Sequence, residues 1–262
     1  MIGYIRVCGL IILTGLLQGC VSQRVKTDLD SIFTERNVEG SIIISSLSGE
    51  HVYQSNSERV KQRYLPASTF KIPNTLIALD EGAITDPDEI FKWDSTVRFV
   101  DSWNQDHSLR TAFPASVVWF YQELASRVGN EAYLRHLKQI SYGNMETGPD
   151  LRTFWLDGDL KISSMEQIDF LKALYNNELP YKSEHIELLK ELMLIEQTDK
   201  YILRAKTGWT NRTRGQHGWY VGYLERKDDV WFFATNLEVT VENARFRQEI
   251  TVEAFKRLGL LD

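Results

Sequence analysis

The sequence predicts a mixed α/β (α+β) fold: an antiparallel sheet built from both chain ends, flanked by N- and C-terminal helices, with an inserted helical lobe. Strand-like runs rich in β-branched and aromatic residues, separated by turn signals, lie within 41–54 and 201–234. From residue 83 to about 197 the pattern is mainly helical, with polar loops. Strands at both ends with helices between them favour one sheet and one lobe. A cleft between the two is the natural place for a ligand site.

Periodicity, capping residues and turn residues set the expected elements. Helices are expected over residues 25–33, 68–81, 115–128, 130–140, from 163 onward, 183–196 and 244–258. Strands are expected over residues 41–47, 51–54, 201–205, 219–224 and 230–234. Asn130 is an expected helix cap, and Ser163 with Glu166 has the spacing of a capping box. Residues 227–229 form the expected hairpin turn between the last two strands.

Residues 1–20 have the features of an export signal. Arg6 precedes an apolar run over 7–17 that is too short to span a membrane. Leu17-Gln18-Gly19-Cys20 also resembles a bacterial lipobox, in which the cysteine is acylated, whereas an ordinary signal peptide would be cut near Gly19 or later. We therefore expect an exported, periplasmic protein, and we leave open a lipid anchor to the membrane through Cys20.

The rest of the chain, 21–262, is expected to form one domain. Its sheet lobe would comprise about 21–60 and 198–262, and its helical lobe about 61–197. Both cysteines, Cys8 and Cys20, lie in the leader, so no disulfide is expected in the mature domain.

Charge and composition argue against two classes of partner. The net charge is −6 and the pI near 5.5, and there is no basic stripe, so nucleic acid is not the expected main partner. The five histidines are scattered, without a His-Glu-x-x-His pair or a Cys/His cluster, so no metal site is expected.

Ser68 and Lys71 form the central candidate pair, three residues apart where an apolar run begins. On a helix such residues share one face, and the unpaired N–H groups of a first turn stabilise an anion. A serine hydroxyl needs a nearby base to become a nucleophile, and Lys71 is the base within immediate reach. The structural alternative is a helix-capping Ser68 beside a solvated Lys71.

Three further short motifs follow in order: Ser116-Val117-Val118, Tyr142-Gly143-Asn144 and Lys206-Thr207-Gly208. Ser-x-x-Lys with a later serine triplet and Lys-Thr-Gly is the motif set of penicillin-recognising serine enzymes. Lys-Thr-Gly at the end of an expected strand is the more informative half, and its structural alternative is a strand edge with a glycine bulge.

The chain resembles the class D, or oxacillinase-type, serine β-lactamases. The resemblance rests on these four motifs and covers nearly all of the chain after the leader. The surrounding segments that also look like this family are residues 91–94, 154–156, 218–223 and 246–248. It implies a serine β-lactamase fold with β-lactam antibiotics as substrates.

For the covalent chemistry, the resemblance implies five catalytic residues. Ser68 would attack the lactam carbonyl and form an acyl-enzyme. Lys71 would carry N6-carboxylation and act as general base, so carbon dioxide or bicarbonate is the one required addition and no other cofactor is implied. Carboxylation needs a neutral amine, which an apolar pocket favours. Trp155 would donate its indole N–H to the carbamate, or be core alone. Ser116, helped by Lys206, would relay a proton to the lactam nitrogen.

For substrate binding, the resemblance implies a second group of residues. Thr207 and Arg247 would hold the substrate carboxylate, although without the family Arg247 reads as a surface salt bridge on the last helix. The N–H groups of Ser68 and Trp209 would form the oxyanion hole. The other substrate-binding residues implied are Val118, Tyr142 and Gly208.

Three other functions fit the sequence less well than a hydrolase. A covalent β-lactam sensor domain normally follows several membrane helices. A penicillin-binding protein carries Ser-x-Asn where this chain has Ser116-Val117-Val118, and a non-enzymatic lipoprotein would leave the motif set unexplained. The short segment 209–217 resembles that of carbapenem-hydrolysing members, which makes carbapenem hydrolysis a hypothesis. Oligomeric state stays open.

Overall fold

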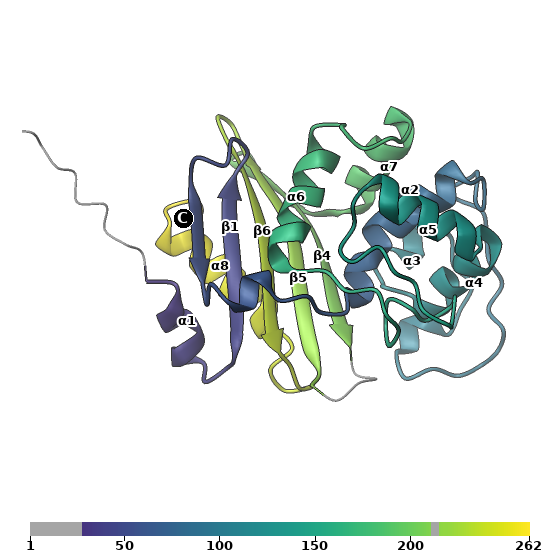
Figure 1. Cartoon of the computed structure of the whole chain (residues 1–262), viewed down its shortest axis with the longest axis horizontal. Helices are drawn as coiled ribbons and strands as arrows, with labels where there is room; N and C mark the ends of the chain where they lie inside the picture. Colours follow the sequence, from purple (N-terminus) through teal and green to yellow (C-terminus); the bar gives the residue numbers. More distant parts are fainter. Residues whose placement is uncertain (1–27, 211–214) are drawn as a thin grey trace, which may run out of the picture.

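The sheet of the computed structural model, which describes residues 28–210 and 215–262, is antiparallel throughout and six-stranded (Figure 1). Its strand order is β2-β1-β6-β5-β4-β3, so the strands from the two chain ends meet where β1 pairs with β6. The strands are β1 (Gly40–Ser46), β2 (Val52–Ser55), β3 (Leu194–Gln197), β4 (Tyr201–Thr210), β5 (His217–Arg226) and β6 (Val230–Glu238). The predicted antiparallel sheet built from both ends is confirmed.

Helices cover both faces of the sheet and form a lobe at one side of it (Figure 1). The α-helices are α1 (Asp30–Glu35), α2 (Lys71–Asp80), α3 (Leu109–Ala112), α4 (Val118–Val128), α5 (Asn130–Gln139), α6 (Ser164–Tyr175), α7 (Ser183–Leu192) and α8 (Phe246–Arg257). Short 3₁₀ turns are η1 (Arg59–Lys61), η2 (Ala67–Phe70) and η3 (Asp101–Trp103). The lobe contains α2 to α5, whereas α6 packs on β6 although it belongs to the segment expected in the lobe.

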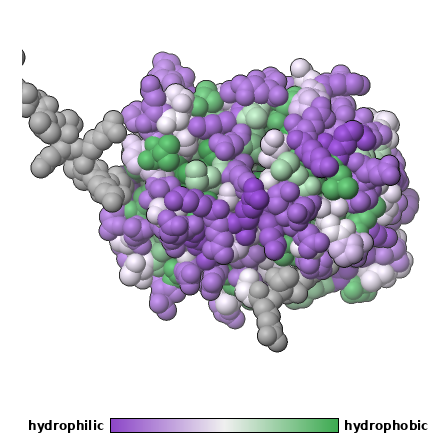
Figure 2. Space-filling model, viewed as in Figure 1, coloured by the Kyte–Doolittle hydropathy of each residue, from purple (hydrophilic) through white to green (hydrophobic). Residues whose placement is uncertain are grey.

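Two hydrophobic cores lie on opposite faces of the sheet, because successive strand residues point to opposite sides. On β1, Ile43 joins the core shared with α2, α4 and α6, while Ile42 and Ile44 join the core under α1 and α8. Burial on both faces explains why the central strands read as continuous apolar runs. Elsewhere the surface is mainly hydrophilic with scattered apolar side chains on the face shown in Figure 2.

Of the predicted boundaries that differ from the structure, three have clear local reasons. The helix expected over 115–128 begins only at Val118, because Ser116 has a φ of +57° and Val117 is extended. The helix expected over 183–196 ends at Leu192, and β3 then pairs with β4. Strand β4 runs on to Thr210 in unbroken register with β5, so Lys-Thr-Gly lies inside the strand without a bulge.

The two predicted caps had different outcomes. Ser163 and Glu166 form the expected capping box at α6. Asn130 makes no capping bond and instead accepts a hydrogen bond from Thr147 Oγ1 at 2.7 Å.

The leader prediction, with Arg6, Cys8 and Cys20, falls outside the described residues. Within residues 28–210 and 215–262, no helix is both long and apolar enough to cross a membrane.

Candidate active site

Ser68 and Lys71 meet at the junction of η2 and α2. A hydrogen bond of 2.9 Å joins Lys71 Nζ to Ser68 Oγ. Lys71 is 0 % exposed, and this burial, together with the positive charge of Lys206, lowers the pKa of Lys71 well below its ordinary value. A buried, neutral amine in contact with a hydroxyl can accept its proton. The alternative of a capping serine beside a solvated lysine does not fit this geometry.

Aromatic side chains surround the buried amine. Lys71 Nζ lies 5.0 Å from the centre of the Tyr121 ring, and Phe70 stacks on Trp155 with ring centres 5.7 Å apart. Trp155 is fully buried, and its Nε1 has no hydrogen-bond partner among the described residues. An unpaired buried N–H is costly, so Trp155 keeps a free donor in the aromatic cluster around Phe70.

Ser116 and Lys206 form a second hydroxyl–amine pair at the cleft. Lys206 Nζ donates a hydrogen bond to Ser116 Oγ, and burial lowers the pKa of Lys206 to about 7, with a further contribution from the positive charge of Arg247. Ser116 adopts the left-handed backbone conformation that a non-glycine residue rarely uses. Such strain costs on the order of 1–3 kcal/mol and clusters at functional sites. The left-handed conformation places the Ser116 hydroxyl between α3 and α4, opposite Lys206.

These groups border a cleft of about 440 Å³ between the sheet and the helical lobe. Seven of the predicted residues line it: Ser68, Ser116, Val118, Thr207, Gly208, Trp209 and Arg247. At Gly208, β4 passes close to η2, since a Cβ there would lie 3.0 Å from Pro66 O and 3.2 Å from Thr69 N. Glycine therefore lets the strand approach the Ser68 turn without a tight contact.

Arg247, the second residue of α8, lies across the sheet edge rather than at the surface. It donates hydrogen bonds of 2.6 Å from Nη1 to Gly208 O and from Nε to Ala244 O. Burial lowers the pKa of Arg247 to about 10, so the guanidinium stays charged at neutral pH. It makes no ion pair within residues 28–210 and 215–262, whereas its neighbour Arg245 pairs with Glu249. A cation without a counter-ion beside the cleft suits a carboxylate ligand.

The comparisons with known proteins agree with this geometry. A family model described as the penicillin-binding protein transpeptidase domain matches residues 35–258. The chain is 42% identical over 226 residues to β-lactamase OXA-48 of Klebsiella pneumoniae, covering 86% of this chain and 85% of that protein. It is 40% identical over 237 residues to β-lactamase OXA-3 of Pseudomonas aeruginosa, covering 89% and 85%. The class D β-lactamase YbXI from Nostoc has a TM-score of 0.87 and 41% identity, covering 89% of this chain and 99% of that one. The chain belongs to the class D serine β-lactamases.

One substrate-binding prediction for this class D β-lactamase needs correction. Tyr142 does not line the cleft; its ring is 1 % exposed and packs against Phe70 and Phe170, with centres 5.9 and 5.1 Å away. Asn144 of the same motif accepts a hydrogen bond from the Lys161 backbone N–H, at 2.9 Å, and so ties two loops together. The Tyr-Gly-Asn motif therefore shapes the site from beneath the Ser68 turn.

Several cleft residues of the class D enzyme escaped the sequence analysis. They are Phe99, Val100 and Trp103, from the loop before α3. Phe99 is 92 % exposed, and isolated apolar residues in a polar loop look like the scattered hydrophobics of any surface. Leu156, in one of the segments that resemble the family, also lines the cleft.

Proposed function

We propose that this class D enzyme hydrolyses penicillins and related β-lactam antibiotics through an acyl-enzyme on Ser68, and so confers resistance to them. The observation that carries the proposal is the 2.9 Å contact between Ser68 Oγ and the fully buried Lys71 Nζ. Two hydroxyl–amine pairs on one cleft can serve both halves of a lactam opening, attack at carbon and protonation at nitrogen.

Acylation uses the two pairs in turn. Ser68 passes its hydroxyl proton to the Lys71 base while Oγ bonds to the lactam carbonyl carbon. The N–H groups of Ser68 and Trp209 stabilise the developing oxyanion. The carbon–nitrogen bond then breaks, and the nitrogen takes the Ser116 proton, which Lys206 replaces through its hydrogen bond to Ser116 Oγ. Before the second half, Lys71 loses the proton it took from Ser68 to solvent and Lys206 regains one. The Lys71 base then takes a proton from a water molecule while the water oxygen bonds to the acyl carbon. The bond from that carbon to Ser68 Oγ breaks, and Oγ takes the proton from Lys71 as the product leaves.

Lys71 would carry carboxylation of its side-chain nitrogen by carbon dioxide. The lowered pKa of Lys71, caused first by burial, supplies the neutral amine that this modification requires. The unpaired buried Nε1 of Trp155 fits an added oxygen acceptor. When present, the carboxylate would supply an anionic general base beside Ser68.

Substrate binding combines charge with apolar contact. Arg247, with Thr207 beside it, would hold the carboxylate that penicillins carry, since guanidinium matches carboxylate geometry. Phe99, Val118 and Leu156 supply apolar lining for the acyl side chain. Carbapenems remain a hypothesis for this cleft, to be decided by the same assay as penicillins.

The deciding experiment is a hydrolysis time course with a penicillin, a chromogenic cephalosporin and a carbapenem, at enzyme concentrations high enough to see one turnover. We expect steady turnover of the penicillin. A single stoichiometric burst would instead mark a covalent sensor. Ser68→Ala should abolish turnover, while Ser126→Ala, on the exposed side of α4, is the matched control and should not. Turnover retained in Ser68→Ala would refute the proposal.

We also propose export to the periplasm, from the Arg6 and 7–17 leader pattern. Mass spectrometry of the mature protein tests the lipid anchor. An acylated N-terminal Cys20 in the membrane fraction would support it, whereas an unmodified N-terminus beyond Cys20 in the soluble periplasmic fraction would reject the anchor and leave export intact.

A further inference from the structure

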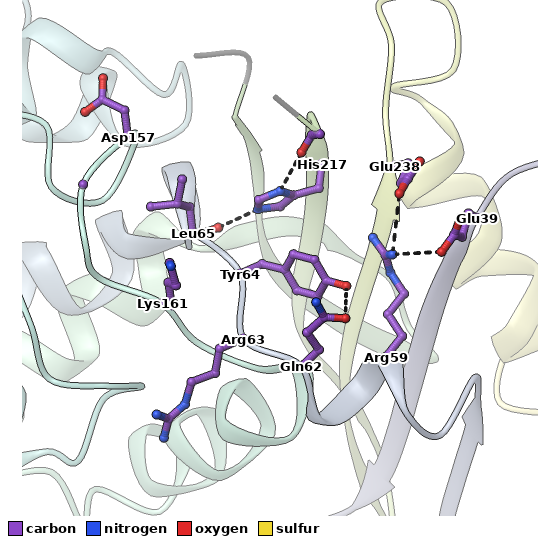
Figure 3. A pocket seen from close by; sticks show the side chains of 12 residues that line it. Glu39, Arg59, Gln62, Arg63, Tyr64, Leu65, Asp157, Lys161, His217 and Glu238 are labelled. Carbon is purple, nitrogen blue, oxygen red and sulfur yellow. Dashed lines mark hydrogen bonds and ion pairs between the residues drawn. The ribbon is translucent and has the colours of Figure 1, made fainter. Parts of the chain in front are cut away.

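The backbone carbonyl of Leu65 accepts hydrogen bonds from two side chains of β5. His217 Nε2 and Trp219 Nε1 each lie 2.9 Å from Leu65 O. The two residues are two positions apart on one strand, so their side chains project from the same face of the sheet. Figure 3 shows the imidazole of His217 pointing from β5 to this carbonyl, at the side of a hollow of about 540 Å³ that charged side chains line.

This carbonyl lies three residues before the nucleophile, in the segment 64–67 that leads into η2. Ala67 in that segment has a φ of +49°, an unfavourable conformation for a residue with a Cβ. Its N–H donates to Trp155 O at 2.9 Å. The segment is thus held to the sheet at Leu65 and to the loop carrying Trp155 at Ala67. A strained turn persists only when its surroundings fix it from several sides.

The protonation state of His217 suits it to this task. The imidazole is 5 % exposed, and burial, assisted by the positive charge of Arg59, lowers the pKa of His217. At neutral pH the ring therefore carries one proton. Leu65 O can only accept a hydrogen bond, so we assign this proton to Nε2, which lies 2.9 Å from it; Nδ1 lies 3.4 Å from Gly215 O. The Tyr64 ring packs against the imidazole at a tilt of 57°, with ring centres 5.0 Å apart, and so restricts its rotation.

We propose that His217 is a positioning residue for Ser68: through Leu65 O it holds the strained turn that aims the hydroxyl at Lys71. The inference rests on the proposed serine acylation. His217 touches neither substrate nor reacting atoms, and it acts through the backbone. Trp219 donates to the same carbonyl, so loss of His217 removes one of the two hydrogen bonds that fix Leu65 and leaves the other in place.

The test compares substitutions at position 217 by stopped-flow kinetics with a chromogenic cephalosporin and a penicillin. His217→Leu keeps the bulk and removes the donor, and we expect the acylation rate to fall about three- to tenfold, the value of one hydrogen bond, with little change in binding. His217→Gln places an amide N–H near the position of Nε2 and should restore most of the rate. Trp219→Phe, which removes the second donor, should lower the same rate constant. His51→Leu, on an exposed histidine preceding β2, is the matched control.

Rates are expressed per acylatable Ser68, counted by mass spectrometry after exposure to penicillin, so that misfolded enzyme does not enter the comparison. A lower melting temperature with an unchanged acylation rate in His217→Leu would show a purely structural role and overturn the inference. Equal losses in His217→Leu and His217→Gln would overturn it as well, because the hydrogen bond would then not be responsible. Failure of the proposed function is separate, since wild-type enzyme would show no penicillin turnover.

Discussion

A methyl group added at Gly218 should weaken substrate binding, although Gly218 lies outside the cleft. A Cβ at this position would lie 2.5 Å from Arg247 Cδ and 2.7 Å from Val239 Cγ1. Such contacts are too short to persist, so the flexible Arg247 stem must move. Its guanidinium would then leave Gly208 O, where Nη1 now donates at 2.6 Å. A displaced guanidinium would no longer reach the substrate carboxylate that it is proposed to hold. One hydrogen bond between that carboxylate and a charged group contributes about 1.5–3 kcal/mol, which corresponds to roughly ten- to a hundredfold in substrate binding.

The assay is steady-state hydrolysis of a penicillin by Gly218→Ala, Arg247→Ala and the double variant, with melting temperatures measured alongside. We expect Arg247→Ala to raise KM by that full factor with a nearly unchanged melting temperature, and Gly218→Ala to raise it by about tenfold or more. The two effects should not add, because both remove the same contact. Val239→Ala, which frees space beside the stem, should partly restore Gly218→Ala. Unchanged KM in Gly218→Ala, or additive losses in the double variant, would refute this reasoning.

Two further predictions concern stability. Ser163→Ala removes the α6 capping box, in which Ser163 Oγ accepts a hydrogen bond from the Glu166 N–H at 3.2 Å. It should lower the free energy of unfolding by about 1 kcal/mol without changing kcat. A specific loss of kcat would contradict a purely capping role. Lys206 has a pKa of about 7 in the folded protein, below its ordinary value. Between about pH 7 and 10 the unfolded chain therefore binds more protons at this residue than the folded protein does. The contribution of Lys206 to the free energy of unfolding rises with pH in that range. Lys206→Met should therefore raise the melting temperature near pH 7, and the gain should shrink toward pH 10; a gain independent of pH would show that burial of charge is not its cause.

The sequence identified the reacting residues of the site more completely than the residues that line the cleft. Ser68, Lys71 and Lys206 could be found because their spacing is itself the requirement for the chemistry. Tyr142 could not be placed, because a motif gives residue order and not the direction of a ring in a turn. Phe99 was missed because its position depends on how the loop before α3 folds over the cleft.

The fold prediction failed where tertiary contacts override local pattern. Residues 194–197 continue an apolar helical spacing, yet they form an edge strand because β4 offers them a partner. Helix α4 begins late because Ser116 takes a left-handed conformation that no propensity predicts, and Lys206 on the facing strand bonds its hydroxyl. These departures lie at the site or at the sheet edge beside the lobe. The strands expected over 41–54 and 219–224 lie within two residues of β1, β2 and β5, whereas β6 begins at the expected Val230 but runs on to Glu238.

Lys71 carrying added carbon dioxide is the general base that we propose for both halves of the reaction. Carbon-13 NMR of enzyme in labelled bicarbonate, at a fixed pH near neutrality, tests it most directly, with penicillin turnover recorded on the same samples. Wild type should show a carbamate signal that Lys71→Ala lacks. Degassed, mildly acidic enzyme should lose the signal and show a burst followed by slow turnover, which bicarbonate restores. Trp155→Ala should resemble the degassed enzyme even near neutral pH. An absent carbamate signal in wild type, together with turnover that does not respond to bicarbonate, would contradict the account and leave Lys71 as a plain amine base.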